Sequence, residues 1–465
     1  MTNGLKRLSG RLAYRREYGS LLKIGLPVLV TQLGIIVVSF ADTMMVGAYG
    51  LDELASSAFV NSLFVIVVVM LIGFASGMTP LVGALYGRGE KREAGRMMAA
   101  GLQLNVVVAL CFTALMGAIY FLLGHFGQDE ELLPLIRSYY LVILCSLVPV
   151  AVFNCVQQTA NATTDTATPM WIILGADALN VAGNYALIFG PWGFPEMGLL
   201  GAGISTLAAR ISAMVAILAV VRWRRRYRPY YEGAVEASGS RAQLRRRIWQ
   251  TSYPVMVQSG VECGLWTFGA VVSGWFGKVQ LAAYQVVNTI AQLGFMIYMS
   301  FGISTSIRVA NFTGQRDATA VRRVAKAGLR LNLLMATLSS AVFLLFTRDL
   351  VVMFTPEASV IAVAVTLVVP LVLYQYGDAV QITYANALRG TSRVKPLFWI
   401  AIASYLLVGI PLLLLLAKGL GFEVVGVYYS FNGALVTASV LLYTAFRKTL
   451  RGQEREFAGA SRGER

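Results

Sequence analysis

The sequence contains an internal repeat. Residues 25–105 align without a gap with residues 252–332, at an offset of 227, and 18 of the 81 positions are identical. Chance matching in so apolar a chain would give about six identities, so the alignment indicates a duplication. The identical pairs include Pro27 with Pro254 and Gly47 with Gly274. Any fold for this chain must therefore build the same set of elements twice.

The composition places both halves in a lipid bilayer. Hydrophobic residues make up 57% of the chain and charged residues 13%, whereas soluble domains carry roughly 25% charged residues. A membrane-spanning helix needs about 20 mostly apolar residues. Twelve such runs are present, at residues 20–47, 54–86, 95–123, 132–160, 169–190, 199–222, 249–275, 281–310, 326–347, 358–388, 396–418 and 424–446.

Twelve spans divide into six and six, and an even number per half predicts parallel repeats with a binding site at their interface, as in transporters. The predicted fold is an all-α membrane protein with twelve transmembrane helices in two pseudo-symmetric six-helix lobes around a central cleft. Residues 1–222 form the first lobe and residues 248–465 the second, including a cytoplasmic tail. Residues 223–247 are expected to be a solvated, basic, cytoplasmic linker.

Basic residues lie on one side of the predicted bundle. They cluster at residues 6–16, 88–96, 222–247, 308–330, 389–395 and 447–455, whereas acidic residues dominate the opposite connections. This asymmetry predicts a multi-pass protein with both termini in the cytoplasm. The chain has a net charge of +16. Its basic residues lie next to the spans, where they fit the headgroups of the lipid bilayer better than they fit nucleic acid. We therefore expect no nucleic-acid partner.

The positions of the cysteines and of the single histidine exclude most classes of catalytic site. The four cysteines all fall within predicted spans with no metal-ligand spacing, and the single histidine, His125, falls in a loop. A membrane-embedded enzyme would need a constellation of nucleophile, base or metal ligands that the spans lack. We expect neither enzymatic activity nor a cofactor.

Five charged residues fall within the predicted spans. The acids are Asp42, Asp177, Glu262 and Asp378, and the one basic residue deep in a span is Arg210. A charge at the bilayer centre costs about 2.5 to 3.5 kcal/mol on insertion scales, so each is a functional candidate. Carboxylates bind Na⁺ through oxygen or carry H⁺ when they are buried. The acids therefore predict an ion-driven transporter.

Glu262 and Asp378 are the strongest candidates for a cation site in the second lobe and for ligands of Na⁺. Trp266 follows Glu262 by one turn, and Tyr374 precedes Asp378 by one turn, so each pair shares a helix face. A tyrosine oxygen beside two carboxylates suits a hard, dehydrated cation. The alternative is that both acids find polar partners and hold helices together.

The duplication does not repeat these acids. Asp42 aligns with Gly269, and Glu262 aligns with Ile35. The two lobes are thus predicted to share a fold but not a site.

The first lobe carries its own polar face. Asp177, Asn180 and Asn184 are spaced by three and four residues, which places them on one face of the fifth span. Thr206 of the sixth span is expected to complete this network. The alternatives are that the asparagines only cap or pack helices, and that Asp177 pairs with Arg210 or lies at the cytoplasmic rim.

Aromatic and flexible side chains are candidates for a substrate cleft, because such surfaces attract positive charge and adapt to many ligands. The alternative is ordinary helix packing. The predicted cleft residues are Phe153, Trp266, Gln285, Phe295, Tyr298 and Tyr376.

Four segments together resemble one family over nearly the whole chain. They are residues 27–47 (PVLVTQLGIIVVSFADTMMVG), 180–206 (NVAGNYALIFGPWGFPEMGLLGAGIST), 257–268 (VQSGVECGLWTF) and 373–396 (LYQYGDAVQITYANALRGTSRVKP). In this order and spacing the chain resembles the multidrug and toxic compound extrusion (MATE) transporters, specifically their NorM-like branch. The resemblance implies two lobes enclosing a central cleft, and export of organic cations from a bacterial cell across the inner membrane in exchange for Na⁺ or H⁺.

The resemblance also implies roles for individual residues. Asp42 matches the acid of the family's first helix, Glu262 and Asp378 match the carboxylate pair of the second lobe, and Tyr374 matches a tyrosine beside that pair. The family's first-lobe polar network matches Asn180, Asn184 and Thr206. Asp177 departs from the family pattern, which leaves the share of the first lobe in ion coupling open.

The leading interpretation is a secondary multidrug efflux antiporter that acts as a monomer on small organic cations. A flippase for lipids or lipid-linked oligosaccharides, from the related superfamily, is the main alternative. An anionic pyrophosphate headgroup would require several basic residues in the spans, and mainly Arg210 is available. A channel is the remaining alternative.

Overall fold

The computed structural model describes residues 2–236 and 241–463. Within these residues, eleven helical stretches are long and apolar enough to cross a membrane, and twelve if the bent pair α13–α14 is one span. The pair bends by 49° at Leu367. Every predicted span coincides with one of these stretches, so the twelve-helix prediction is confirmed.

The helices of the first half of the chain are α1 (Thr2–Tyr49), α2 (Leu51–Ser76), α3 (Met78–Gly87), α4 (Lys91–Tyr120), α5 (Leu133–Cys145), α6 (Leu147–Ala162), α7 (Ala167–Phe189), α8 (Gly198–Trp223) and α9 (Arg228–Val235). The second half has α10 (Arg241–Trp275), α11 (Lys278–Gly314), α12 (Ala318–Val352), α13 (Ala358–Thr366), α14 (Val368–Gly390), α15 (Lys395–Ala401), α16 (Ile410–Leu414) and α17 (Glu423–Gly463). Two π-helical segments, Ile402–Gly409 and Leu415–Gly419, join α15, α16 and the turn before α17.

Local sequence explains where several helices begin and end. Gly190 adopts a left-handed φ of 65° and ends α7, a conformation that costs glycine little. The Asp317 carboxylate accepts a hydrogen bond of 2.9 Å from the Ala320 amide and so caps the start of α12.

Contacts divide the chain into two compact units, which we call the N-unit (residues 30–256) and the C-unit (residues 1–29 and 257–465). The two boundaries, after Leu29 and after Met256, differ by 227 residues, which is the offset of the duplication. Helices α1 and α10 each contain a proline two residues before the boundary, Pro27 and Pro254. Each helix therefore leaves one unit and enters the other at the same point of the repeat.

This division differs at its edges from the predicted lobes, residues 1–222 and 248–465. The beginning of α1 belongs to the C-unit because its buried residues Leu21 and Ile24 share a face with Gly25, which lies against Phe301 of α11. The beginning of α10 belongs to the N-unit, where Ile248 is part of an apolar cluster.

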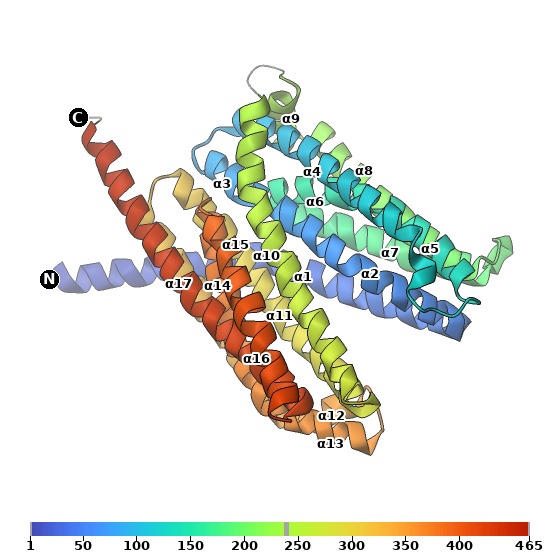
Figure 1. Cartoon of the computed structure of the whole chain (residues 1–465). Helices are drawn as coiled ribbons and strands as arrows, with labels where there is room; N and C mark the ends of the chain where they lie inside the picture. Colours follow the sequence, from blue (N-terminus) through green and yellow to red (C-terminus); the bar gives the residue numbers. More distant parts are fainter. Residues whose placement is uncertain (1, 237–240, 464–465) are drawn as a thin grey trace. The chain divides into compact units, whose positions relative to one another are not determined.

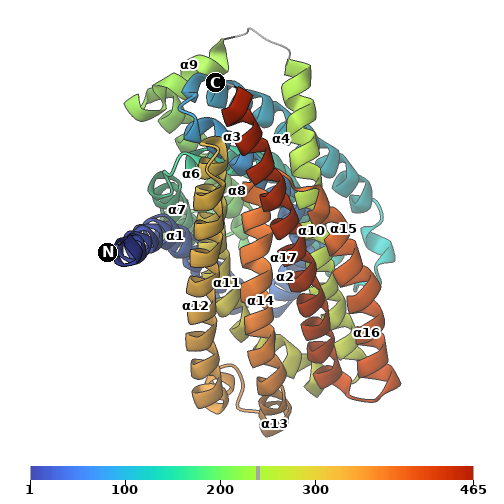
Figure 2. The same ribbon diagram turned by 90° about the vertical axis from the view of Figure 1, so that its left-hand side faces the viewer.

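Each unit is a helical bundle with its own apolar core. In the N-unit, α4, α6, α7 and α8 pack side by side (Figure 1). In the C-unit, α14 packs between α11, α12 and α17 (Figure 2). Helix α14 thus brings its polar residues into the middle of the C-unit.

The linker is more structured than the sequence suggested. Helix α9 lies against the first turns of α4 (Figure 1). A β-carbon on Gly95 would lie 2.0 Å from the Tyr230 carbonyl oxygen. Because glycine has no side chain, the backbones of α4 and α9 can come into contact there. Burial raises the pKa of Tyr230 to about 12. Buried tyrosines within an otherwise charged segment explain why this part of the linker packs on the N-unit.

Candidate functional site

The C-unit presents two carboxylates from neighbouring helices. Glu262 lies on α10, and Asp378 lies on α14 and is 1% exposed. The Oε1 atom of Glu262 accepts a hydrogen bond of 3.3 Å from Nε2 of Gln381. Neither carboxylate oxygen of Asp378 has a hydrogen-bond partner among the residues that the structure describes. Gln381 follows Asp378 by three residues on α14, so its hydrogen bond to Glu262 brings the two acids to the same part of the C-unit, one of them hydrogen-bonded and the other not.

Gln381 and Tyr405 complete this site and were not predicted from the sequence. Nε2 of Gln381 also donates to the Tyr405 hydroxyl at 3.0 Å, and Tyr405 forms a hydrogen bond with Glu262. Gln381 follows Asp378 by three residues, so its helical spacing was a usable signal. Tyr405 lies in a π-helical segment, whose changed periodicity gives no such signal.

Arg389 is a further residue that sequence analysis placed in a loop cluster. It lies in the last turn of α14, and its Nη2 atom donates to Oε1 of Gln258 at 3.0 Å. Gln258 precedes Glu262 by one turn of α10. The end of α14 therefore places a basic side chain against α10, one turn before Glu262.

Aromatic side chains one helical turn from each acid pack against one another. Tyr374 is buried and its ring lies 5.5 Å from that of Trp266, which packs edge-on against Phe431 at 4.4 Å. The structure thus brings together Glu262, Asp378, Tyr374 and Trp266, as the sequence predicted for one lobe.

The remaining cleft candidates take different positions. Tyr298 is fully buried and donates from its hydroxyl to Oε1 of Gln375 at 2.8 Å, and Phe295 and Tyr376 pack around the same small cluster. Gln285 is exposed. In the N-unit, Phe153 belongs to an apolar core cluster. Tyr298 and Phe153 are therefore packed as core residues in this structure.

The polar face of the N-unit is centred on Asp42. Nδ2 of Asn184 donates to Oδ1 of Asp42 at 2.5 Å, and Nδ2 of Asn180 donates to the Thr206 hydroxyl at 3.2 Å. Both asparagines are buried. A β-carbon on Gly183 would lie 2.4 Å from the Ser205 hydroxyl, so this glycine allows the close approach of α7 and α8. The spacing on α7 thus places its amides toward α1 and α8.

Asp177 and Arg210 do not pair with one another among the described residues. Nη1 of Arg210 donates to the Ser146 hydroxyl at 2.5 Å, and its charge acts on Asp42. The Oδ2 atom of Asp177 lies beside Gly34, where an added β-carbon would be 3.2 Å away, and it has no hydrogen-bond partner in the described part of the chain. Asp42 and Asp177 are thus two acids of the N-unit, of which the first is hydrogen-bonded to Asn184 and the second lies beside α1 at Gly34.

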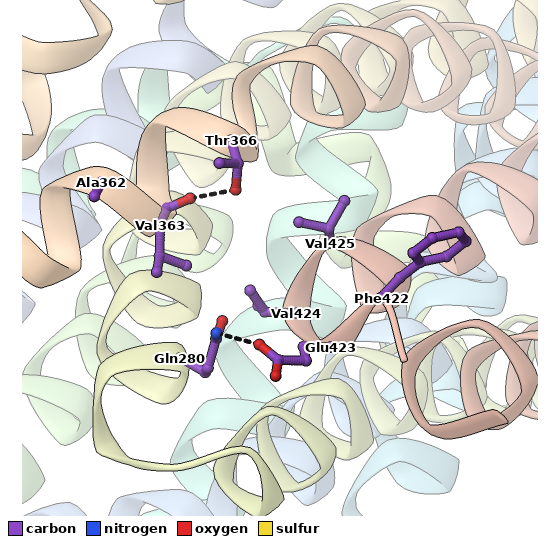
Figure 3. Close-up of a pocket in the computed structure, with 8 residues that line it drawn as sticks. All are labelled: Gln280, Ala362, Val363, Thr366, Phe422, Glu423, Val424 and Val425. Carbon is purple, nitrogen blue, oxygen red and sulfur yellow. Dashed lines mark hydrogen bonds between the residues drawn. The ribbon is translucent and has the colours of Figure 1, made fainter. Parts of the chain in front are cut away.

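A separate cavity of about 310 Å³ lies where α11, α13 and α17 meet. Its wall is largely apolar, and the Glu423 carboxylate accepts a hydrogen bond from the Gln280 amide there (Figure 3). The residues that line it include none of the predicted site residues. Glu423 is therefore a carboxylate of the C-unit that stands apart from the acidic pair.

Within the described residues, no group of three or more His, Cys, Asp or Glu side chains is placed to hold a metal ion. The oxygens available to a cation in the C-unit come from two carboxylates and neutral neighbours. Such a donor set suits a transported monovalent cation better than a resident transition metal.

Comparison with known proteins agrees with the duplicated architecture. The MatE family model matches the chain twice, over residues 27–186 and 254–415, and the two matches begin 227 residues apart. A probable multidrug resistance protein NorM from Bradyrhizobium diazoefficiens is 26% identical over 94% of both chains. A probable multidrug resistance protein NorM from Xanthomonas axonopodis pv. citri is 27% identical over 92% of this chain and 93% of its own.

Solved structures show the same fold. The eukaryotic MATE transporter AtDTX14 superposes with a TM-score of 0.85 at 19% identity, over 96% of this chain and 100% of its own. A MATE protein in the bent conformation also gives 0.85, at 16% identity, over 97% of this chain and 99% of its own. The chain belongs to the MatE family, the multidrug and toxic compound extrusion transporters.

Proposed function

We propose that the chain is a secondary active multidrug efflux antiporter, which exports organic cations in exchange for Na⁺ or H⁺ by alternating access. The observation that carries this proposal is Asp378, a carboxylate that is 1% exposed and lacks a hydrogen-bond partner among the described residues. A buried acid without a neutral partner is costly unless a cation neutralises it. The NorM names of the relatives support a multidrug substrate range.

The charge distribution supports cationic substrates. Asp42, Asp177, Glu262 and Asp378 lie within membrane-spanning helices, and aromatic rings flank the C-unit pair. Positive charge and apolar area are the two properties that such surroundings favour. A flippase for anionic headgroups would instead require free basic side chains within the spans, whereas Arg210 donates to Ser146 and Arg389 donates to Gln258.

The membrane potential limits which ratios of ion to drug can drive export. Moving one charge through 100 mV is worth about 2.3 kcal/mol, so exchange of one Na⁺ for one monovalent drug gains nothing from the membrane potential. Export then requires either the concentration gradient of the ion or entry of more than one cation per drug. We expect the protein to act as a monomer in the bacterial inner membrane, with both termini in the cytoplasm.

The test is efflux of ethidium from proteoliposomes that contain the purified protein, with Na⁺ and H⁺ gradients imposed separately. We expect one of the two gradients to accelerate efflux and empty liposomes to show none. Transport of anionic lipid-linked sugars without movement or binding of cationic dyes would establish the flippase alternative instead.

A further inference from the structure

One carboxylate lies between two guanidinium groups where the beginning of α1 meets α11 and α12. The Glu17 side chain is 7% exposed, and its Oε2 atom accepts a hydrogen bond of 2.9 Å from Nη2 of Arg308. Its Oε1 atom lies 3.9 Å from Nε of Arg323, a distance too long for a hydrogen bond. All three residues belong to the C-unit. Glu17 is thus a buried acid shared by two arginines of neighbouring helices.

These three side chains carry more hydrogen-bond donors than acceptors. Each guanidinium has five N–H groups, whereas one carboxylate supplies two acceptor oxygens. The Nε atoms of Arg308 and Arg323 are buried and have no hydrogen-bond partner among the residues that the structure describes. A buried donor without a partner is costly. One negative charge faces two positive charges, so the group as a whole lacks an anion that can accept several hydrogen bonds.

The other ion pairs of the C-unit do not share this deficit. Among the described residues, Arg322 pairs with Glu454 and Arg393 pairs with Glu456, one arginine to one acid. Arg322 is the sequence neighbour of Arg323, so two adjacent arginines differ in whether each has an acid of its own. The surplus of positive charge is therefore a property of the junction around Glu17.

The junction lies where α1 enters its apolar span. The side chains of Arg308 and Arg323 are 21% and 28% exposed, so a group from outside the protein can reach them. Leu22 and Leu26, which follow Glu17 on α1, are 37% and 50% exposed. Residues 2–24 contain six basic residues and a single acid, Glu17. Exposed leucines next to a basic segment are typical of a helix that meets the bilayer at the level of the headgroups.

We propose that the junction of Glu17, Arg308 and Arg323 is a binding site for the phosphate group of an anionic membrane lipid. A phosphate diester carries one negative charge and accepts hydrogen bonds at its oxygens, which matches the missing charge and the unused donors. Planar guanidinium groups suit phosphate oxygens because two parallel N–H groups can donate to them. The exposed leucines of α1 offer the acyl chains an apolar surface. Lipid bound there fastens the beginning of α1 to α11 and α12, whichever ion and drug the protein exchanges.

The experiment is thermal unfolding of the purified full-length protein in detergent, titrated with phosphatidylglycerol. A ligand that binds only the folded state raises Tm. We expect phosphatidylglycerol to raise the Tm of the wild type more than an equal amount of phosphatidylcholine, which has no net charge. Arg323→Gln should remove at least half of this difference between the two lipids.

Arg322→Gln is the matched control, because it removes the same charge from the neighbouring position, where Glu454 already compensates it. It should keep the full difference between the two lipids. An equal loss in Arg322→Gln and Arg323→Gln would show that the lipid responds only to the general positive charge of this surface, and the proposed site would be wrong.

Glu17→Gln gives a readout that a purely structural ion pair would not give. The substitution removes the acid that competes with a phosphate, so the protein is less stable without lipid but should bind phosphatidylglycerol about tenfold more tightly. The rise in Tm on addition of the lipid should therefore exceed that of the wild type, a result that does not depend on the folding of Arg323→Gln. An equal or smaller rise would overturn the proposal.

Inorganic phosphate distinguishes a lipid headgroup from a free anion. At the concentration of phosphatidylglycerol that half-saturates the wild type, inorganic phosphate should leave Tm unchanged, because it gains nothing from the apolar surface of α1. A rise in Tm equal to that with the lipid would assign the site to a soluble phosphate and refute the lipid assignment.

Discussion

The Ser252 hydroxyl of α10 lies so close to Gly77 that a β-carbon at position 77 would be 2.3 Å from its oxygen. The repeat mates of these residues are Gly25 and Ser304, and they are also in contact, with serine and glycine exchanged between the two helices. Helices α1 and α10, which pass from one unit to the other, therefore each make one glycine–serine contact. The contact is present in both repeats, but α10 contributes the serine and α1 contributes the glycine.

Gly77→Ala should destabilise the N-unit, because the added methyl group would also lie 2.6 Å from the Ser252 α-carbon. Overpacking of this kind costs about 1 to 3 kcal/mol, measurable as a lower Tm of the purified protein in detergent. Gly117→Ala is the control, since no atom lies within 4 Å of a β-carbon there, and it should not lower Tm. Equal Tm values for the two variants would contradict the close contact.

An ion pair fastens the beginning of α1 within the C-unit. Oε2 of Glu17 accepts a hydrogen bond of 2.9 Å from Nη2 of Arg308, with side-chain exposures of 7% and 21%. At the repeat offset of 227, Arg308 corresponds to Leu81, and Glu17, which precedes the aligned segment, corresponds to Leu244; both leucines belong to an apolar cluster of the N-unit. The first helix of one repeat is thus held by an ion pair, and the first helix of the other by apolar contacts.

Glu17→Gln should lower the free energy of unfolding by about 3 kcal/mol, because it leaves a largely buried guanidinium without its partner. The double variant Glu17→Leu with Arg308→Leu copies the apolar pair of the other repeat and should recover most of that loss. Chemical denaturation of the three proteins in detergent provides the comparison. A double variant less stable than Glu17→Gln would show that the position does not tolerate an apolar contact.

The acidic pair of the C-unit should be essential for coupled transport. Glu262→Gln and Asp378→Asn are expected to reduce ion-driven ethidium efflux at least tenfold while the protein still inserts into membranes. Glu423→Gln, which removes a carboxylate outside this site, should transport at the wild-type rate. The assignment fails if both site variants are well folded and transport normally.

Asp42 is expected to link ion and drug binding in the N-unit, where Asn184 orients its carboxylate. By linkage, an ion that weakens drug binding is itself displaced by the drug to the same extent. Asp42→Asn should reduce efflux and flatten the dependence of drug affinity on Na⁺ or pH, in a binding titration of purified protein. Identical shifts in wild type and variant would make Asp42 a structural acid.

Asp177→Asn tests the acid by which this chain departs from its family. If Asp177 shares the coupling of Asp42, through their electrostatic interaction, the substitution should flatten the same titration. An unaltered titration together with an unaltered Tm would assign no role in coupling to this residue.

Most of the fold could be predicted from two features of the sequence, the lengths of its apolar runs and its internal duplication. Spans are set by how many consecutive residues stay apolar, which is a local property of the sequence. For the same reason the acids Asp42, Glu262 and Asp378 were identifiable, since a charge inside an apolar run is visible without coordinates. The spacing of Asn180 and Asn184 likewise predicted a shared face, because helical periodicity is local.

Only the tertiary structure decided which unit each end of α1 and α10 joins, because that choice depends on contacts such as Gly77 with Ser252, between residues far apart in the sequence. It also decided that Arg389, at the end of α14, donates to Gln258 of α10. A flexible side chain can extend several ångströms from its own helix, so its partner is set by how the helices pack and not by its position in the chain.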